Sequence, residues 1–385
     1  MVKISPAAQA LIARLGELAP LVAAHAVEAE REARLPDAVA QPLLAGGLFR
    51  MWVPAACGGL ELSLTDALAV YENAAGLSGS LGWAVMIGNG GGLFGAWLPP
   101  QGAQELFAPP HALVAGSGAP SGTAERVPGG YRAQGRWRYA SGAHHASVFT
   151  ANCRITEAGR ALVDADGKPL IRAMSFQPAD VTVLPDWDTS GLRATGSHSF
   201  QVESAFVPEH HTFSVITDPA RAAGPLYRLP FIVLTQLPVA AVGLGLMRQA
   251  LALFAALVRT KPVAEGGTLA QDSTVQARYA QGVAELALVQ AGVEAAATRA
   301  WDTVVAGGEI DAVQLAQIAA VTTLGLARLR AALDQLAAVA GMDAIGPGGF
   351  ARACRDFGAL CAHGSVSPRN LAAAGAELLQ SASNG

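Results

Sequence analysis

The C-terminal segment 355–364 carries side chains suited to acid/base chemistry. Arg355 and Asp356 are followed, seven residues after the aspartate, by His363 at the end of an apolar helical stretch. Histidine has the side-chain pKa closest to neutrality, so a histidine held in such a place can donate or accept a proton. A single histidine at helical spacing is also typical of an ordinary core or surface residue. This pattern alone does not decide the chemistry.

A second segment, 129–146, combines aromatic residues with a Ser-Gly pair. Trp137 and Tyr139 alternate with charged residues, and Ser141-Gly142 follows them. Alternating aromatics are compatible with strand residues that pack a core. A strand that ends in Ser-Gly also places a hydroxyl and backbone N–H groups at the rim of a sheet, where they suit the binding of a polar heteroaromatic ring.

Two other patterns carry no chemistry in this interpretation. Residues 90–95 satisfy G-x-G-x-x-G, but the run lies in a helical region and no acidic residue follows at the required distance, so it does not predict a dinucleotide site. The four cysteines are scattered without a C-x-x-C pair. Cys354, Cys361 and His363 match no zinc spacing and lack a fourth ligand, so we predict no metal site.

The elements that position these residues fall into three predicted domains, 1–110, 111–215 and 225–385, of an α+β, mostly α protein. The first domain is helical, and Ser63 with Asp66 at the third helical position predicts a helix start. The central domain shows short β-type runs between turn signals, which predict an antiparallel barrel or sandwich. These runs are 112–116, 130–133, 147–155, 171–176, 181–184 and 199–207.

The third domain is predicted to be a four-helix bundle with short glycine-rich links. Its expected helices are 237–261, 273–305, 312–340 and 350–361. The stretches 73–104 and 229–247 are long and uncharged, but glycine, proline and glutamine interrupt them, so we interpret them as buried helices and expect no membrane partner.

Composition sets further bounds. The 385 residues are 51% hydrophobic and 15% charged, which excludes a disordered chain and indicates a large core. A net charge of -4 without a basic run argues against nucleic acid as the partner. The N-terminus lacks an apolar signal core, so we expect a cytoplasmic protein.

Several motifs together resemble the acyl-CoA dehydrogenase superfamily. They are the Val53-Pro54 to Gly58-Gly59-Leu60 loop, the run 191–199 followed by Val207-Pro208, and the C-terminal Arg-Asp pair. The resemblance covers nearly the whole chain and implies that superfamily's order of helical, β and helical domains. A dehydrogenase of this kind would carry a glutamate base at Gly364 or on an early helix of the third domain. No acidic residue occurs at either place.

The residues found instead resemble those of the two-component flavin-dependent monooxygenases of the same fold. The matching motifs are Trp137-x-Tyr139-x-Ser141-Gly142-x-x-His145, Ser80-x-Gly82-Trp83 and His363 after the Arg-Asp pair. Ala353-Cys354 departs from the aromatic residue that many members carry before the arginine. That departure leaves the shape of the pocket open.

The resemblance implies an oxygenase component that receives reduced FAD or FMN, with FAD favoured, from a separate NAD(P)H-dependent flavin reductase. Reduced flavin and O2 would form a C4a-hydroperoxide that hydroxylates a small aromatic substrate such as a phenol or indole. The implied site residues are His363 and His145 for catalysis, Trp137, Ser141 and Gly142 for the flavin, and Trp83 for the substrate pocket. A homotetramer is implied as well.

Two alternatives stay open at this point. One is an acyl-CoA dehydrogenase with an unconventional base, which would hold oxidised FAD that bleaches with an acyl-CoA in the absence of air. The other is a flavin- or ligand-binding scaffold without catalysis. Four further histidines, His144, His198, His210 and His211, are interpreted as strand or loop residues without a role.

Overall fold

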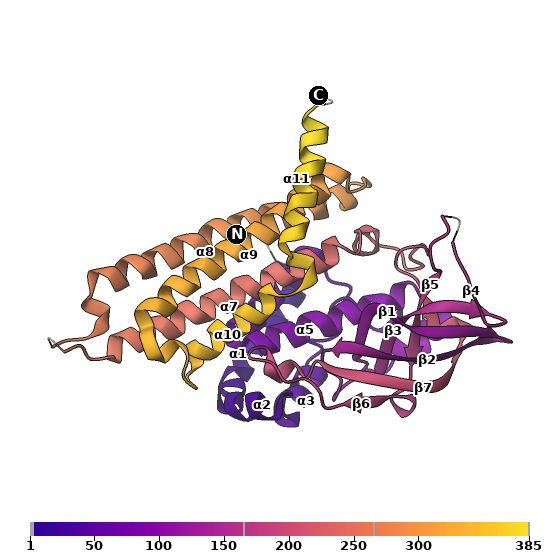
Figure 1. Ribbon diagram of the computed structural model, residues 1–385, viewed down its shortest axis with the longest axis horizontal. Coiled ribbons are helices and arrows are strands. Elements are labelled where there is room, and N and C mark those ends of the chain that lie inside the picture. The colour runs from indigo at the N-terminus through magenta and orange to yellow at the C-terminus, as the bar shows by residue number, and fades with distance from the viewer. Residues whose placement is uncertain (1–3, 165, 265, 384–385) are drawn as a thin grey trace.

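The computed structural model describes residues 4–164, 166–264 and 266–383, and it places the helical and β regions in the expected order. The outermost residues of the first and third predicted domains, 1–3 and 384–385, lie outside this description. Figure 1 shows the sheet at one end of the molecule and the long helices α8 and α9 at the other. The active-site candidates come from all three regions.

The N-terminal region is helical, as predicted. Its helices are α1 (Pro6–Ala24), α2 (Ala26–Glu32), α3 (Asp37–Ala45), α4 (Leu64–Leu77), α5 (Gly79–Gly92) and α6 (Pro100–Phe107). The Ser63 hydroxyl accepts a hydrogen bond from the Asp66 amide at 3.1 Å, so the predicted cap of α4 is confirmed.

The glycine-rich run at 90–95 lies in α5 and the 3-10 turn that follows it, so it forms no strand-to-helix phosphate loop. Two of its glycines allow close packing instead. A Cβ at Gly91 would lie 2.4 Å from the Val114 Cβ, and one at Gly92 would lie 2.8 Å from a Val53 methyl carbon. Because Gly91 lacks a side chain, α5 lies directly against the first strand of the sheet.

The central region forms a mixed sheet, which corrects the predicted antiparallel barrel or sandwich. Its strands are β1 (Val114–Val127), β2 (Gly130–Ala140), β3 (Val148–Glu157), β4 (Arg160–Ala161), β5 (Ile171–Phe176), β6 (Thr182–Leu184), β7 (His198–Pro208) and β8 (Thr212–Phe213). The order is β6-β7-β2-β1-β3-β5-β8, with β4 on β3. After the β1–β2 hairpin the chain crosses to the far side of β1, so β3 pairs with β1 in parallel.

The C-terminal region contains five helices in the described residues: α7 (Val233–Thr260), α8 (Ser273–Val305), α9 (Ala312–Ala340), α10 (Gly349–Cys361) and α11 (Pro368–Ala382). The first four match the prediction closely. Helix α11 was not predicted, although Ser367 caps it and Pro368 opens it, both ordinary start signals. It packs on α9 and extends away from the body of the molecule (Figure 1).

Helix α7 runs without interruption through Pro238, and the predicted helix 237–261 already contained this residue. Pro238 lies near the helix start, where few backbone hydrogen bonds are lost. Helices α1, α7 and the helical run Ala312–Ala344 are long and apolar enough to span a bilayer by length and composition alone. In this fold α7 packs against α4, α5, α8, α9 and α10, and 61% of its most apolar window is buried.

Candidate active site

Three predicted residues from different regions meet at one place. Trp83 comes from α5, Ser141 from the loop after β2, and His363 from the turn after α10. The Trp83 indole N–H donates to the Ser141 hydroxyl at 3.0 Å. The His363 ring meets the Trp83 ring edge-on, with centroids 5.2 Å apart. The structure thus brings a hydroxyl, an indole and an imidazole together where α5, the sheet and α10 join.

Ser141 belongs to a chain of buried hydroxyls with a defined direction. The Thr195 hydroxyl donates to the Leu192 carbonyl at 2.7 Å, so it accepts from Ser197 at 2.6 Å. Ser197 therefore accepts from Ser141 at 2.7 Å. Since Ser141 donates to Ser197 and accepts from Trp83, one lone pair of its hydroxyl is left for a further donor.

His363 is half-buried, and burial lowers its pKa below the ordinary histidine value. It is therefore neutral at neutral pH. Its Nδ1 lies 2.8 Å from the Ser365 hydroxyl and accepts from the Ser365 amide at 3.4 Å. An Nδ1 that accepts carries no proton, so Nε2 carries it. This tautomer presents an N–H donor on the far side of the ring from Ser365.

A pocket next to this group is lined by residues of the N-terminal region and of the sheet region. Its lining residues are Arg34, Leu35, Ala40, Leu44, Phe49, Ala84, Gly88, Leu113, Ser141, Gly142, His144, His145, Ala194, Thr195 and Gly196. Ser141 lies both in this wall and in the hydroxyl chain. The lining is mostly apolar with a few polar groups.

His145 lies in this pocket wall, held by contacts to the N-terminal region. Its Nε2 lies 2.8 Å from the Leu35 carbonyl, and its Nδ1 lies 3.6 Å from an Asp37 carboxylate oxygen. His144, for which no role was predicted, also lines the pocket. Burial lowers its pKa, and the neighbouring His198 lowers it further. His198 itself accepts from the Trp187 amide at 3.0 Å and is structural.

Trp137 corrects a prediction, because the structure gives it a packing role. It is 0% exposed, stacks on Phe200 with centroids 5.2 Å apart, and donates from its indole to the Asn152 carbonyl at 3.0 Å. A Cβ at Gly122 would lie 2.0 Å from the indole, so a glycine in β1 makes room for it. Trp137 is a core residue of the sheet and does not line the pocket.

Tyr139 is the aromatic residue that reaches the rim. It is 60% exposed, has a left-handed backbone at φ 69°, and meets the Trp187 ring edge-on. The β2–β7 pairing shifts register between Trp137 and Ala140, so the bulge turns Tyr139 away from the face that Trp137 occupies. Simple alternation would put residues 137 and 139 on the same face, and the bulge separates them.

The backbone N–H groups of the Ser-Gly turn are not free, which corrects a further expectation. The Ser141 amide donates to the Tyr139 carbonyl at 3.1 Å, and the Gly142 amide donates to the Thr195 carbonyl at 2.8 Å. Gly142 has φ 78°, and a Cβ there would meet nothing within 4 Å. Glycine thus allows the turn, and the space beside it is open.

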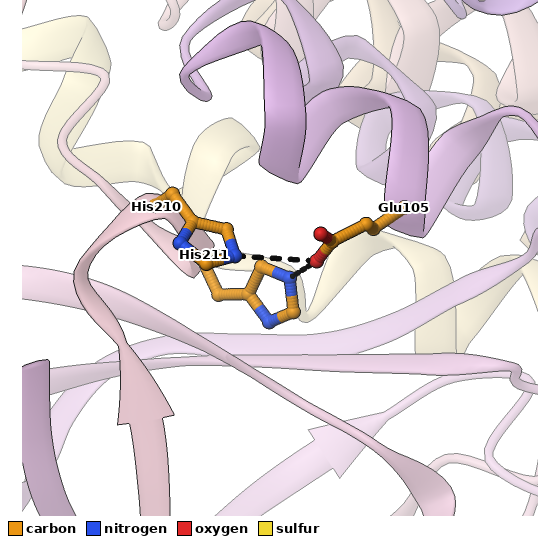
Figure 2. Close-up of side chains that lie close together, drawn as sticks. All are labelled: Glu105, His210 and His211. Atoms are coloured by element: carbon orange, nitrogen blue, oxygen red, sulfur yellow. Dashed lines mark hydrogen bonds and ion pairs between the residues drawn. The ribbon is translucent and has the colours of Figure 1, made fainter.

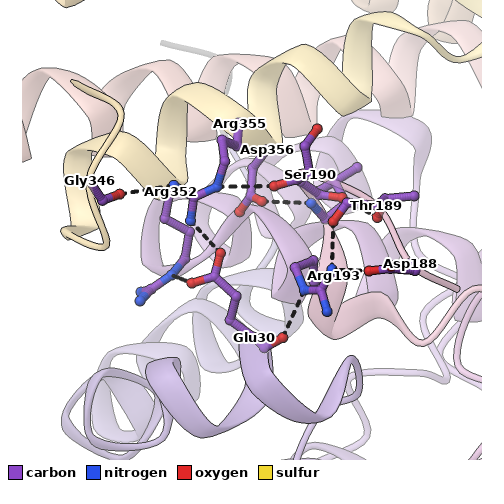
Figure 3. A network of polar contacts seen from close by, with 11 residues as sticks. Glu30, Asp188, Thr189, Ser190, Arg193, Gly346, Arg352, Arg355 and Asp356 are labelled. Atoms are coloured by element: carbon purple, nitrogen blue, oxygen red, sulfur yellow. Dashed lines mark hydrogen bonds and ion pairs between the residues drawn. The ribbon is translucent and has the colours of Figure 1, made fainter. Parts of the chain in front are cut away.

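Arg355 and Asp356 join the three regions behind the site (Figure 3). Arg355 pairs with Glu30 of α2 and donates to the Ser190 carbonyl at 3.0 Å. Asp356 is 4% exposed and accepts from the Leu192 amide at 2.6 Å. The pair is structural, and it fixes the loop that carries Thr195 and Ser197 relative to α10 and His363.

Comparison with known proteins decides the family. The model of the acyl-CoA dehydrogenase N-terminal domain matches residues 13–98, and that of the acyl-CoA dehydrogenase C-terminal domain matches residues 237–368. The chain is 31% identical to a pigment production hydroxylase of a Rhodococcus species over 283 residues, 70% of this chain and 69% of that one. This chain belongs to the acyl-CoA dehydrogenase superfamily.

Its relatives in that superfamily are monooxygenases. An indole-3-acetate monooxygenase of Acinetobacter baumannii is 27% identical over 355 residues, 91% of this chain and 89% of that one. Other relatives are named as oxygenase subunits or components of flavin-dependent enzymes. The structure of XiaF from a Streptomyces species, in complex with FADH2 and glycerol, superposes with a TM-score of 0.88 at 27% identity, covering 97% of this chain and 96% of XiaF.

This acyl-CoA dehydrogenase homologue is therefore an oxygenase component of the two-component flavin-dependent monooxygenase branch. The position where a superfamily dehydrogenase would carry its glutamate is Gly364, beside His363. A Cβ at Gly364 would meet nothing within 4 Å, so space for a longer side chain exists and the residue is glycine nonetheless. The acid/base group that the structure offers at this end of the site is His363.

Proposed function

We propose that this chain hydroxylates a small aromatic compound such as an indole or a phenol, using reduced flavin from a separate NAD(P)H-dependent reductase. The observation that carries the proposal is the meeting of Trp83, Ser141 and His363 beside an apolar pocket. When bound, reduced flavin supplies the two electrons with which one atom of O2 enters the product and the other leaves as water.

The residues around Ser141 fit a reduced flavin. A reduced flavin ring carries N–H donors, and the Ser141 hydroxyl has one acceptor position left after its bonds to Trp83 and Ser197. Open space beside Gly142 and the exposed Tyr139 ring suit a flat aromatic group at the same rim. We therefore assign Ser141 and Gly142 to flavin binding, add Tyr139 in place of Trp137, and favour FAD over FMN.

His363 is proposed as the catalytic histidine. In the neutral tautomer described above, its Nε2–H can donate a hydrogen bond to an oxygen that gains charge during the reaction, and the proton stays on the imidazole. To accept a phenol proton at Nε2, a neutral imidazole would need its own proton on Nδ1. The Ser365 amide N–H points at Nδ1 and opposes a proton there. The geometry supports the donor role over the acceptor role.

His145 is proposed as a wall of the substrate pocket, and Trp83 as a substrate contact beside that pocket, next to His363. Trp83 lies between Ser141 and His363, so a substrate against its ring lies near both polar groups. His145 is 8% exposed at its side chain and its Nε2 is held by the Leu35 carbonyl, which fixes it in the pocket wall, where we propose that it orients a substrate. The pocket excludes water from the reacting atoms because its lining is mostly apolar.

The direct experiment supplies purified protein with a flavin reductase, NADH, FAD and either indole or phenol in air. We expect an oxygenated product that requires both proteins and whose new oxygen comes from labelled O2. Reductase alone is the control, because it consumes O2 without making this product. Absence of an oxygenated product across indoles and phenols, with flavin bound, would refute the substrate class.

We also infer that the chain assembles as a homotetramer. Large apolar side chains are exposed on the helices of the C-terminal region: Val283, Leu288, Val305, Leu324 and Leu379. Exposed residues of this kind on long helices favour contact with other copies. Light scattering of the purified chain gives the mass directly, and a monomer at micromolar concentration would contradict the inference.

A further inference from the structure

A second group of chemically active side chains lies outside the active site. It consists of Glu105 on α6 and of His210 and His211 in the 3-10 turn Glu209–His211, between β7 and β8. The His211 Nε2 lies 2.7 Å from a Glu105 carboxylate oxygen, and the His210 Nε2 lies 3.2 Å from the same oxygen. Figure 2 shows both imidazole rings directed at this oxygen.

The spacing of these atoms suits a bound metal ion. In a tetrahedral zinc site with ligand bonds of about 2.0–2.1 Å, neighbouring ligand atoms lie about 3.3 Å apart. One ligand atom from each of the three residues lies within 4.8 Å of the others. An ion that replaced the two N–H protons would need only small movements of the rings. Two imidazoles and a carboxylate then leave a fourth position for water.

The backbone holds these ligands in place before any ion binds. A Cβ at Gly102 would lie 1.9 Å from the His210 carbonyl oxygen, so α6 rests directly on the turn that carries the histidines. Gln101 donates to the other Glu105 carboxylate oxygen at 2.9 Å, which keeps the first oxygen toward His210 and His211. A site formed in advance loses little conformational entropy on binding.

The ligands are also accessible from solvent. The side chains of Glu105, His210 and His211 are 45%, 28% and 10% exposed. The donor set is the one that zinc and its neighbours in the first transition row accept, whereas Mg²⁺ prefers oxygen ligands alone. An ion here would join α6 of the N-terminal region to the end of the sheet.

We propose that Glu105, His210 and His211 form a surface site for one Zn²⁺ ion that clamps α6 to the turn between β7 and β8. The site is separate from the flavin chemistry and does not depend on the proposed substrate. Its sequence signal is weak, because the adjacent histidines lie 105 and 106 residues from the carboxylate.

The test is a calorimetric titration of untagged, chelator-treated full-length protein with Zn²⁺ at pH 7.5. We expect one ion per chain and a higher melting temperature with Zn²⁺ than without it. Glu105→Gln and His211→Ala should each weaken binding at least tenfold, and a thousandfold excess of Mg²⁺ should not compete. If His211→Ala unfolds, His210→Ala offers the same readout at a more exposed position.

The matched control is His25→Ala. His25 lies 2.6 Å from Glu28 in a two-residue surface pair without a third ligand. Its removal should leave the Zn²⁺ affinity unchanged. The proposal is overturned if the wild-type chain binds no stoichiometric Zn²⁺, if Glu105→Gln and His210→Ala bind it as tightly as wild type, or if His25→Ala causes the larger loss.

Discussion

The buried carboxylate of Asp356 makes a quantitative prediction about stability. Burial raises the pKa of Asp356 to about 6 against the opposing effects of the Leu192 amide and two nearby arginines, whereas an aspartate in the unfolded chain has a pKa of about 3.9. The folded protein thus holds this proton more tightly. Its contribution to the free energy of unfolding is greatest below pH 4 and is lost as the pH rises to 6.

The magnitude follows from the two pKa values. A pKa of about 3.9 in the unfolded chain and of about 6 in the folded protein corresponds to about 3 kcal/mol of unfolding free energy in total. About 2 kcal/mol of this is lost between pH 4 and pH 7.5. Asp356→Asn keeps an oxygen for the Leu192 amide but carries no charge at any pH. Wild type loses this contribution as the pH rises, and the variant has none to lose. From pH 4 to pH 7.5, the free energy of unfolding of the variant should therefore rise by about 2 kcal/mol relative to that of wild type.

Urea unfolding followed by tryptophan fluorescence at several pH values measures this difference. The comparison uses the pH dependence, so a constant offset from the new amide does not affect it. Glu309→Gln is the control, because Glu309 is an exposed acid and its loss should leave the wild-type pH dependence unchanged. If the free energy of unfolding changes with pH in the same way for wild type and Asp356→Asn, burial does not raise the pKa of Asp356 and the reasoning is refuted.

Three further predictions concern the site and its support. Gly191→Ala should destabilise the protein by about 1–3 kcal/mol in urea unfolding, because the new Cβ would lie 2.1 Å from the Arg355 carbonyl oxygen. Gly375→Ala is the control, because a Cβ there would meet nothing within 4 Å, and it should not destabilise the protein. Ser365→Ala should lower kcat up to roughly tenfold with unchanged flavin affinity, because the His363 Nδ1 loses a hydrogen-bond partner. The acidic limb of the wild-type pH–rate profile should lie below about 6.5, because burial lowers the pKa of His363 and a second proton, on Nδ1, would oppose the Ser365 amide that orients the ring.

Local signals predicted most of the helices. The cap at Ser63 and the glycine-rich links around α8, α9 and α10 act over a few residues, so the sequence shows them directly. The parallel pairing of β1 and β3 was not predictable in this way. It depends on the chain crossing to the far side of β1 after the hairpin, and that path is set by tertiary packing.

The candidate site could likewise be predicted only in part. The motifs that resemble the monooxygenases named Trp83, Ser141 and His363, which the structure brings together from three regions. They also assigned Trp137 to the flavin, because a motif does not show the bulge that turns Tyr139 to the rim. The partners Ser197 and Ser365 were missed because a lone serine carries no signal until a neighbouring hydroxyl or imidazole is in place.

The central claim is that this oxygenase component transfers oxygen with the Nε2–H of His363 as a hydrogen-bond donor. The most direct measurement mixes protein holding reduced FAD with O2 and indole in a single turnover, and compares wild type with His363→Ala. We predict equal affinity for reduced FAD, and at least a hundredfold slower product formation in the variant, with O2 lost as hydrogen peroxide. Equal rates and yields of product in the two proteins would contradict the account.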